Sequence, residues 1–209
     1  SMIISVLFTL KKAEAFQKKA AHTYYVSNVG RDENIGTKAK PFKSIDKINT
    51  LHLQAGDTVY FKSGETFKGT LLPVQDINGN TKKPIVITSY GKGKAVIDAK
   101  DSSAVRIYKA SYLKLQNLKL TGSGRKTGNI KDGLAVINSD HIEVKNMDIS
   151  GFQKSGLLIY SSQNILADNV SVHDNGSAGI TVEAPYQTRQ SRDIKILNCR
   201  AENNPGDPT

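Results

Sequence analysis

The sequence predicts an all-β protein, a right-handed parallel β-helix with three strands per coil. Two observations carry this prediction: a repeat of about 23 residues, and three short runs of alternating apolar residues within each repeat. A repeat of this length, with insertions confined to polar stretches, is typical of a solenoid. Short runs rich in β-branched residues favour strands over helices.

Three glycines set the period, and each opens a short apolar run 23 residues after the one before it: Gly133, Gly156 and Gly179. Between the second and third predicted strands an asparagine recurs, at Asn117, Asn146, Asn169 and Asn198. The frame holds for all four when two six-residue insertions are placed in the polar stretches 121–131 and 185–191. Because Asn tolerates a left-handed bend and stacked amides hydrogen-bond to one another, these residues predict an internal, structural asparagine ladder.

The same frame predicts four inward columns of apolar residues, as the core of a solenoid requires. They are Val105/Leu134/Leu157/Ile180, Ile107/Val136/Ile159/Val182, Leu113/Ile142/Ile165/Ile194 and Leu118/Met147/Val170/Cys199. Cys199 is therefore expected to be a buried small hydrophobe rather than a reactive thiol. Asn175 follows the third strand and is expected to be a solvated turn residue, so Asn169→Ala should cost more stability than Asn175→Ala.

The first 21 residues precede the predicted cap and have features of an export signal. An apolar run of eight residues at 3–10 is followed by a small-x-small pattern at 13–15, although Lys11 and Lys12 stand after the run. This segment predicts a protein that is secreted, periplasmic or on the cell surface; the alternative is an amphipathic N-terminal helix. The run is too short to span a membrane.

Residues 22–69 are predicted to form an N-terminal cap. A strand at Thr23–Ser27 and a polar loop at 28–40 come first. A helix is expected at Ser44–Leu51, because the apolar residues follow helical spacing after an early proline, and such a helix would cover the open end of the core. Further strands are expected at 58–61, Thr70–Pro73, Pro84–Ser89 and Ala95–Asp98, and they lead into β-helix coils over 70–209.

Composition narrows the classes of partner. The 209 residues suit one domain, and the single cysteine excludes a disulfide framework. The net charge of +10 favours an acidic partner, or else reflects a solvated lysine-rich face. The chain has no tryptophan and no familiar nucleic-acid motif, so an acidic polysaccharide is favoured over nucleic acid.

Two N-terminal segments carry a resemblance to a known group. They are TYYVSNVGRDENIGTKAKPFKSIDKI at 23–48 and LQAGDTVYFKSGETF at 53–67. Together they resemble the N-terminal portion of secreted right-handed β-helix proteins, namely the family 9 pectate lyases and related β-helix glycoside hydrolases. The resemblance implies a protein that degrades polysaccharide, with β-elimination of a uronate polymer as the expected reaction. A β-helix glycoside hydrolase and a non-catalytic carbohydrate-binding protein or adhesin are the alternatives.

The resemblance also implies a calcium site and a catalytic base. In the pectate lyases an aspartate cluster binds calcium and a later lysine acts as the base; of such a cluster this chain offers Asp207. The chain is therefore expected to be an N-terminal fragment, with its catalytic residues beyond Thr209 and little activity of its own. Paired carboxylates for hydrolysis are not evident either.

Candidate binding residues lie on the outward side of the first predicted strand, where they alternate with the inward columns. They are Arg106, Tyr108, Tyr160 and Glu183. Aromatic rings two coils apart can stack on sugars and Arg106 can pair with a carboxylate, or the rings simply protect one another in an exposed ladder. The exposed Ile137 and Leu158 suggest that a loop covers this face, and the insertion at 122–131 is one candidate.

Other acidic residues are expected to be solvated. Asp132, Asp174 and Asp207 stand in or near turns and are too scattered to establish a calcium site. His173 and Asp174 are neighbours that could form an acid–base pair, but in a turn their side chains are expected to point apart.

Overall fold

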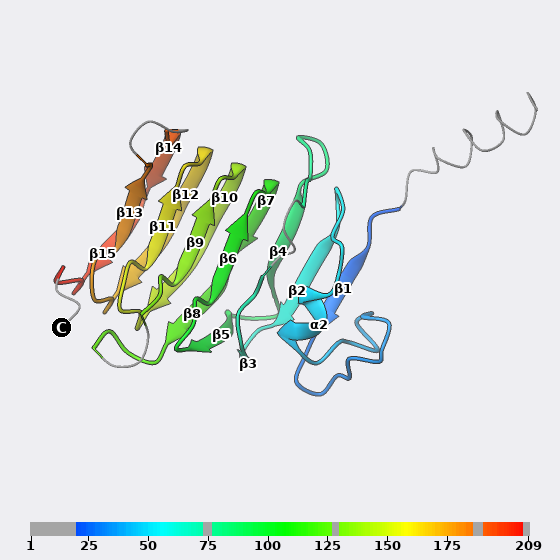
Figure 1. Ribbon diagram of the computed structural model, residues 1–209. Coiled ribbons are helices and arrows are strands. Elements are labelled where there is room, and N and C mark those ends of the chain that lie inside the picture. The colour runs from blue at the N-terminus through cyan, green and yellow to red at the C-terminus, as the bar shows by residue number, and fades with distance from the viewer. Residues whose placement is uncertain (1–19, 73–76, 127–129, 186–189, 207–209) are drawn as a thin grey trace, which may run out of the picture.

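The computed structural model describes residues 20–72, 77–126, 130–185 and 190–206, and the strands stack side by side along one axis (Figure 1). The elements before the repeats are β1 (Thr23–Val26), α2 (Ile45–Asn49), β2 (Thr58–Lys62), β3 (Thr66–Lys68), β4 (Ile85–Tyr90) and β5 (Ala95–Lys100). Those of the repeats are β6 (Val105–Tyr108), β7 (Ser111–Gln116), β8 (Leu118–Gly122), β9 (Leu134–Ile137), β10 (Asp140–Ser150), β11 (Leu157–Tyr160), β12 (Gln163–His173), β13 (Ile180–Glu183), β14 (Arg192–Leu197) and β15 (Arg200–Glu202).

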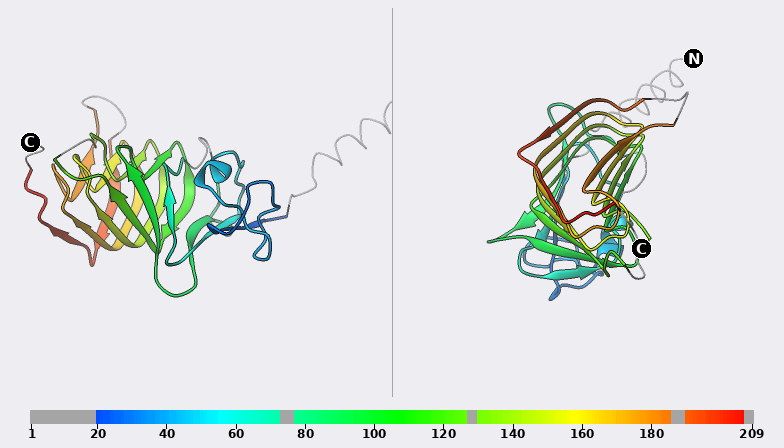
Figure 2. Two further views of the ribbon diagram at one scale, coloured as in Figure 1. Left: turned by 90° about the horizontal axis from the view of Figure 1, so that it is seen from below. Right: turned by 90° about the vertical axis from the view of Figure 1, so that its left-hand side faces the viewer.

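All pairs between these strands are parallel, as predicted, and the sheet curls around a common interior (Figure 2). The first-strand sheet is the four-stranded stack β6, β9, β11 and β13. The second-strand sheet runs through β1, β2, β4, β7 and β14 with the first halves of β10 and β12. The third-strand sheet consists of β3, β5, β8 and β15 with their second halves. In β10 and β12 the second and third predicted strands are continuous and bend in the middle.

The register confirms the four predicted inward columns. Val105 pairs with Leu134, and Leu134 pairs with Leu157, so equivalent residues of successive coils stack on one another. Most of these side chains are fully buried in one continuous core. Towards β13 and β14 the core residues are more exposed: Val182 reaches 43% and Cys199 is half-buried against the core, with its thiol near the Ala167 carbonyl.

The predicted asparagine column exists, but it lies on the surface. Its four members have left-handed φ values between 52° and 57°, which bends the chain between the second and third strands. The Asn146 amide donates to Asn117 over 3.1 Å and the Asn169 amide donates to Asn146 over 2.7 Å, whereas Asn198 donates to Asp168. Asn146 and Asn169 are exposed, so the prediction of an internal ladder was wrong: at an outward bend the amides point to solvent.

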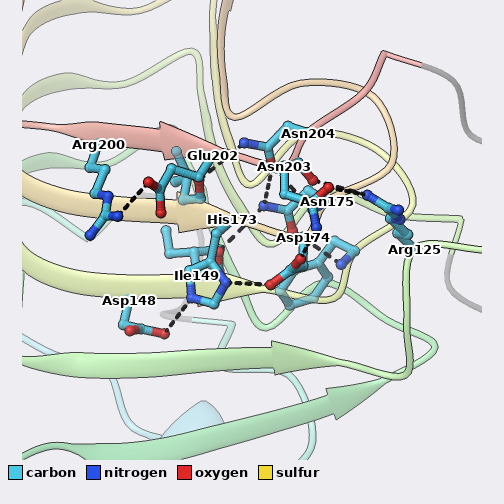
Figure 3. Close-up of polar contacts among 12 residues, drawn as sticks. Arg125, Asp148, Ile149, His173, Asp174, Asn175, Arg200, Glu202, Asn203 and Asn204 are labelled. Carbon is cyan, nitrogen blue, oxygen red and sulfur yellow. Dashed lines mark hydrogen bonds and ion pairs between the residues drawn. The ribbon is translucent and has the colours of Figure 1, made fainter.

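A second asparagine pair forms the buried ladder instead (Figure 3). Asn175 is 0% exposed; its amide oxygen accepts from the Phe152 N–H, and its amide nitrogen donates to the Ile149 carbonyl and to Asn204. Asn204 in turn donates to the Val172 carbonyl. The prediction that Asn175 is a solvated turn residue was therefore wrong, because after the third strand the chain turns inward and its side chain bonds to the coils on either side.

The repeating glycines Gly133, Gly156 and Gly179 are needed because a side chain would not fit there, and none of them has a positive φ. A methyl group on Gly156 would lie 2.8 Å from the Asn175 amide nitrogen and 3.0 Å from the Gly179 carbonyl oxygen. At Gly133 it would lie 2.6 Å from Ile149. The glycines thus let the start of the first strand approach the end of the third, which closes each coil.

The N-terminal part contains the short helix α2 within the predicted span Ser44–Leu51. Ser44 caps it by accepting from the Lys47 N–H, while Ile45 and Ile48 are buried. The role of this helix as a cap stays a prediction. Of the strand expected at Thr70–Pro73, the described residues form one parallel bridge, from Leu71 to Val105, and Pro73 lies outside the described residues; the strand β3, which pairs with β5, comes earlier in the chain and was not predicted.

The structure does not test the predicted export signal. The predicted export signal falls almost wholly on residues 1–19, which lie outside the described residues. Within the described part of the chain, no helix has the length and apolar character needed to cross a bilayer.

Candidate functional site

The register brings the four predicted binding residues onto the outward side of the first-strand sheet. Tyr108, Ile137, Tyr160 and Glu183 form one column there, and Arg106, Ala135, Leu158 and Thr181 form the other. Tyr108 and Tyr160 are therefore two coils apart, about 10 Å on the strand spacing. This placement does not test their predicted role in sugar binding, which stays a prediction.

The four residues differ in how free they are. Arg106 is exposed and makes no ion pair with the described residues. The Lys109 ammonium lies 5.4 Å from the centre of the Tyr108 ring, so that ring already has a cation near it. Tyr160 makes no ring contact within the described ranges, and its ring is thus the freer of the two.

A groove of about 410 Å³ lies where strands β11 and β13 meet the turns that precede the first strands. Its lining residues are Asp132, Gln153, Lys154, Ser155, Leu158, Ser177 and Glu183. Of the four predicted binding residues, Glu183 lines it. The lining combines hydroxyl, amide, ammonium and carboxyl groups with one leucine, a set that suits polar ligands with many hydroxyls.

The floor of this groove is held by hydrogen bonds between successive turns. The Ser155 N–H donates to the Asp132 carboxylate over 3.0 Å, and the Ser155 hydroxyl lies 2.6 Å from that of Thr181. Burial raises the pKa of Asp132, against the opposing effects of the Ser155 N–H and of Lys154. The prediction that Asp132 is a solvated turn residue was wrong, since the following turn covers it; nothing in its local sequence signals this.

His173 and Asp174 correct another prediction, because their side chains face each other (Figure 3). The left-handed φ of 55° at Asp174 turns its carboxylate back to His173, whose Nδ1 lies 2.7 Å away. Hydrogen bonds from His173 and then Asn203 lower the pKa of Asp174, which is exposed as predicted. On the other side, His173 Nε2 lies 3.5 Å from Asp148 Oδ1, which has Lys119 at 3.8 Å.

The insertion that begins at Gly122 contacts these same turns. Arg125 reaches across to Asn203, donating to its backbone and side-chain oxygens over 3.0 Å and 3.1 Å. Whether the insertion covers Ile137 and Leu158 stays a prediction, since residues 127–129 lie outside the described ranges.

No metal centre is evident in the described part of the chain, where no three His, Cys, Asp or Glu side chains are grouped so as to hold an ion. Asp207, the predicted calcium ligand, falls outside the described residues. The calcium site thus remains a prediction based on resemblance.

Residues 24–209 match a family model described as the Pel9A-like, right-handed β-helix region. The chain belongs to this Pel9A-like family. The match spans the N-terminal segments and the coils together, so the resemblance seen in the N-terminal sequence extends along the chain from residue 24.

Several proteins are similar to this Pel9A-like chain. The uncharacterized protein YwoF of Bacillus subtilis is 25% identical over 183 residues, which are 87% of this chain and 34% of that protein. The GH136 lacto-N-biosidase of Eubacterium ramulus superposes with a TM-score of 0.72 at 21% identity, over 91% of this chain and 42% of the other.

Two lyases share the fold more distantly. An alginate lyase from Paenibacillus gives a TM-score of 0.61 at 16% identity, over 85% of this chain and 58% of the lyase. Pectate lyase Pel9A gives 0.56 at 17% identity, over 84% of this chain and 53% of that structure. The chain therefore spans a third to somewhat over half of the proteins it matches, and at these identities the likeness concerns the fold.

Proposed function

We propose that this chain is part of a polysaccharide-degrading β-helix protein, that its first-strand sheet binds an acidic polysaccharide, and that the whole protein cleaves the polymer by β-elimination. The observation that carries the proposal is the groove of about 410 Å³ on the outward side of the first-strand sheet. Family membership and the two lyases of like fold support the reaction class.

The charges on this face suit a uronate polymer in part. Arg106 is an exposed cation and Lys154 lines the groove, so each is available to a sugar carboxylate. A cation that neutralises the uronate carboxylate also acidifies the neighbouring C–H, which a base then removes. Glu183 opposes such binding, because two carboxylates repel each other.

Glycoside hydrolysis is the second candidate, and Asp132 is the observation that favours it. A carboxyl whose pKa is raised by burial keeps its proton more readily and can serve as a general acid. The second carboxyl of the groove is Glu183. The register places it two coils away, about 10 Å along the stack, and near the opposite end of the strand. Inverting hydrolases need their two carboxyls about 6.5–9.5 Å apart, so elimination is favoured.

The two reactions are separated by their products. The protein containing this chain is incubated with polygalacturonate, alginate and a neutral galactan, and both ultraviolet absorbance and reducing ends are followed. Elimination yields an unsaturated, absorbing product from a uronate polymer. Reducing ends without absorbance, released from galactan alone, would contradict the proposal and favour hydrolysis.

Charge variants test the binding face itself. Arg106→Met is expected to weaken uronate binding about twofold to fivefold, as loss of one exposed charge pair does. Glu183→Gln is expected to strengthen it by a similar factor, because a repulsive charge is removed. Lys92→Met is the control, since Lys92 is exposed in the turn after β4 and outside the groove. Loss of binding in Glu183→Gln would count against a uronate ligand.

A further inference from the structure

A second pocket, of about 270 Å³, lies on the outward side of the second-strand sheet. It is formed between the turn at Asn80–Pro84 and the early residues of β7, β10 and β12. It shares no lining residue with the groove on the first-strand sheet. The two hollows occupy different sheets of the coil, so a ligand in one leaves the other open.

Two stacked aromatic rings form the centre of this pocket. The Tyr112 and His141 rings are 4.4 Å apart between centroids and only 19° from parallel. The register pairs these residues directly, because their neighbours Ser111 and Asp140 are paired. Pro84 and Leu166 add apolar surface beside them.

The coil geometry does not require these rings. Tyr112, His141, Asn164 and Asp193 occupy one column with left-handed φ values between 51° and 54°. Asn and Asp are the residues that adopt this conformation readily, and they fill it in the later coils. Histidine also tolerates this conformation, whereas tyrosine adopts it rarely, so the ring at 112, stacked on that of His141, calls for a reason other than the bend.

The polar groups around the rings are mostly paired, with two notable exceptions. Asp140 accepts from the Asn164 amide over 2.9 Å and lies 2.7 Å from His141 Nδ1. The Lys114 ammonium lies 3.3 Å from the Glu143 carboxylate. The Tyr112 hydroxyl and His141 Nε2 make no hydrogen bond with any described residue. The pocket thus offers two polar groups to a ligand and little net charge.

We propose that this pocket is a second carbohydrate-binding site, which takes a neutral sugar unit. Its ring faces, apolar edge and two open hydrogen-bonding groups match a hexose, whose C–H faces are apolar and whose rim carries hydroxyls. Among the lining residues a uronate carboxylate finds no unpaired cation, because Lys114 is paired with Glu143; the exposed Lys82 and Lys83 belong to the flanking turn but do not line the pocket. The site is independent of the proposed groove, since the two share no lining residue and take sugars of different charge.

The test uses the full chain and small neutral oligosaccharides derived from galactan, xylan and cellulose. Binding is followed by NMR through the ring signals of Tyr112 and His141. His141→Asn is the variant of choice, because it removes the ring while keeping a residue suited to φ 53°, as Asn164 does one coil later. Lys92→Met again serves as the control.

We expect at least one neutral oligosaccharide to shift both ring signals and His141→Asn to weaken that binding about tenfold, with uronate binding unchanged. The proposal is overturned if no neutral sugar shifts the rings at millimolar concentration, or if His141→Asn binds as tightly as the parent. Equal binding of oligogalacturonate at these rings would overturn its neutral specificity. If the groove on the first-strand sheet does not bind uronate, Arg106→Met and Glu183→Gln would leave uronate binding unchanged, whatever the result at the ring pocket.

Discussion

Asn175 connects three consecutive coils through one side-chain amide. It accepts from Phe152 and donates to Ile149 in the preceding coil, and it bonds to Asn204 in the next. Buried backbone groups that lose such a partner cost about 1–3 kcal/mol each, so its contribution to stability should be large. Asn169, on the surface column, bonds only to Asn146 among the described residues.

Asn175→Ala is therefore expected to lower the free energy of unfolding by about 3 kcal/mol, because two buried backbone groups lose their partner. Asn169→Ala should cost about 1 kcal/mol, mainly for placing alanine at a left-handed φ. Urea denaturation with equal m-values measures both. Equal costs, or a greater cost at Asn169, would contradict the buried ladder at Asn175.

Asp132 gives a prediction about pH. Its folded-state pKa is raised above the ordinary value of 3.8, so the folded protein binds a proton more readily than the unfolded chain does. This group's contribution to stability consequently falls as pH rises through the raised pKa. The Asp132→Asn variant, which keeps an oxygen for the Ser155 N–H, should lose that pH dependence. The readout is the difference between the two unfolding free energies at pH 4 and pH 7; a constant difference would refute the shift.

Residue type alone could not separate the two kinds of asparagine. The surface column recurs visibly, but the buried pair does not, because Phe152 occupies the equivalent place one coil earlier and an insertion separates Asn175 from Asn204. Burial at a corner depends on whether the chain turns inward or outward there. Whether the chain turns inward or outward depends on the backbone conformation at the corner, which could not be predicted from the pattern of polar residues.

At the scale of the element, a single left-handed residue shapes the long strands β10 and β12. Each is eleven residues long and bends at Asn146 or Asn169, where φ is 52° or 54°. The bend sends the two halves into different sheets. A residue that cannot adopt this φ should therefore disturb two sheets at once.

Substitutions at Asn146 test this directly. Asn146→Gly is expected to be nearly neutral, within about 0.5 kcal/mol, since glycine adopts positive φ freely and the two lost amide bonds, to Asn117 and from Asn169, are exposed. Asn146→Val should cost about 2 kcal/mol, because a β-branched side chain is strained there. Lys195→Val, at an exposed position of β14 without a positive φ, is the control. Thermal unfolding that ranks valine equal to glycine at 146 would exclude the bend as the cause.

Most strands were predictable from alternation, because one face of each is buried and the other is not. β3 was not: Thr66 and Lys68 are exposed around the buried Phe67, and three residues are too few to show a period. Its place is decided by pairing with β5, a contact some 30 residues away. Leu71, in the strand expected at Thr70–Pro73, is buried, yet it makes only a single bridge.

For the whole molecule, the net charge of +10 leads to an expectation about affinity. Binding of the chain to polygalacturonate should weaken steeply as salt is raised to about 1 M, where charges are screened beyond about 3 Å. Binding of neutral oligosaccharides should hardly change. Affinity electrophoresis at both salt levels compares the two, and salt-independent uronate binding would argue against a charge-driven contact.

The fold could be predicted from the repeat, whereas the candidate sites could be predicted only in part. The outward columns followed from the register, and Glu183, predicted on the outward side of the first strand, lines the groove there. The groove was missed because most of its walls come from turns whose conformation no period describes, and the ring pocket because it combines outward strand residues of three coils with such a turn. Asp132 and His141 are each ordinary in the local sequence and become notable only beside residues from the neighbouring coils.

The unequal length of the coils has a mechanical consequence. The register pairs Leu113 with Ile142, Ile142 with Ile165 and Ile165 with Ile194, so successive coils contain 29, 23 and 29 residues. Because the interstrand bonds lie along the stack, tension applied along it would peel away one coil at a time. At about 3.5 Å per extended residue, each rupture would release roughly 80 Å or 100 Å of chain. Force spectroscopy should then record a sawtooth with two alternating step lengths.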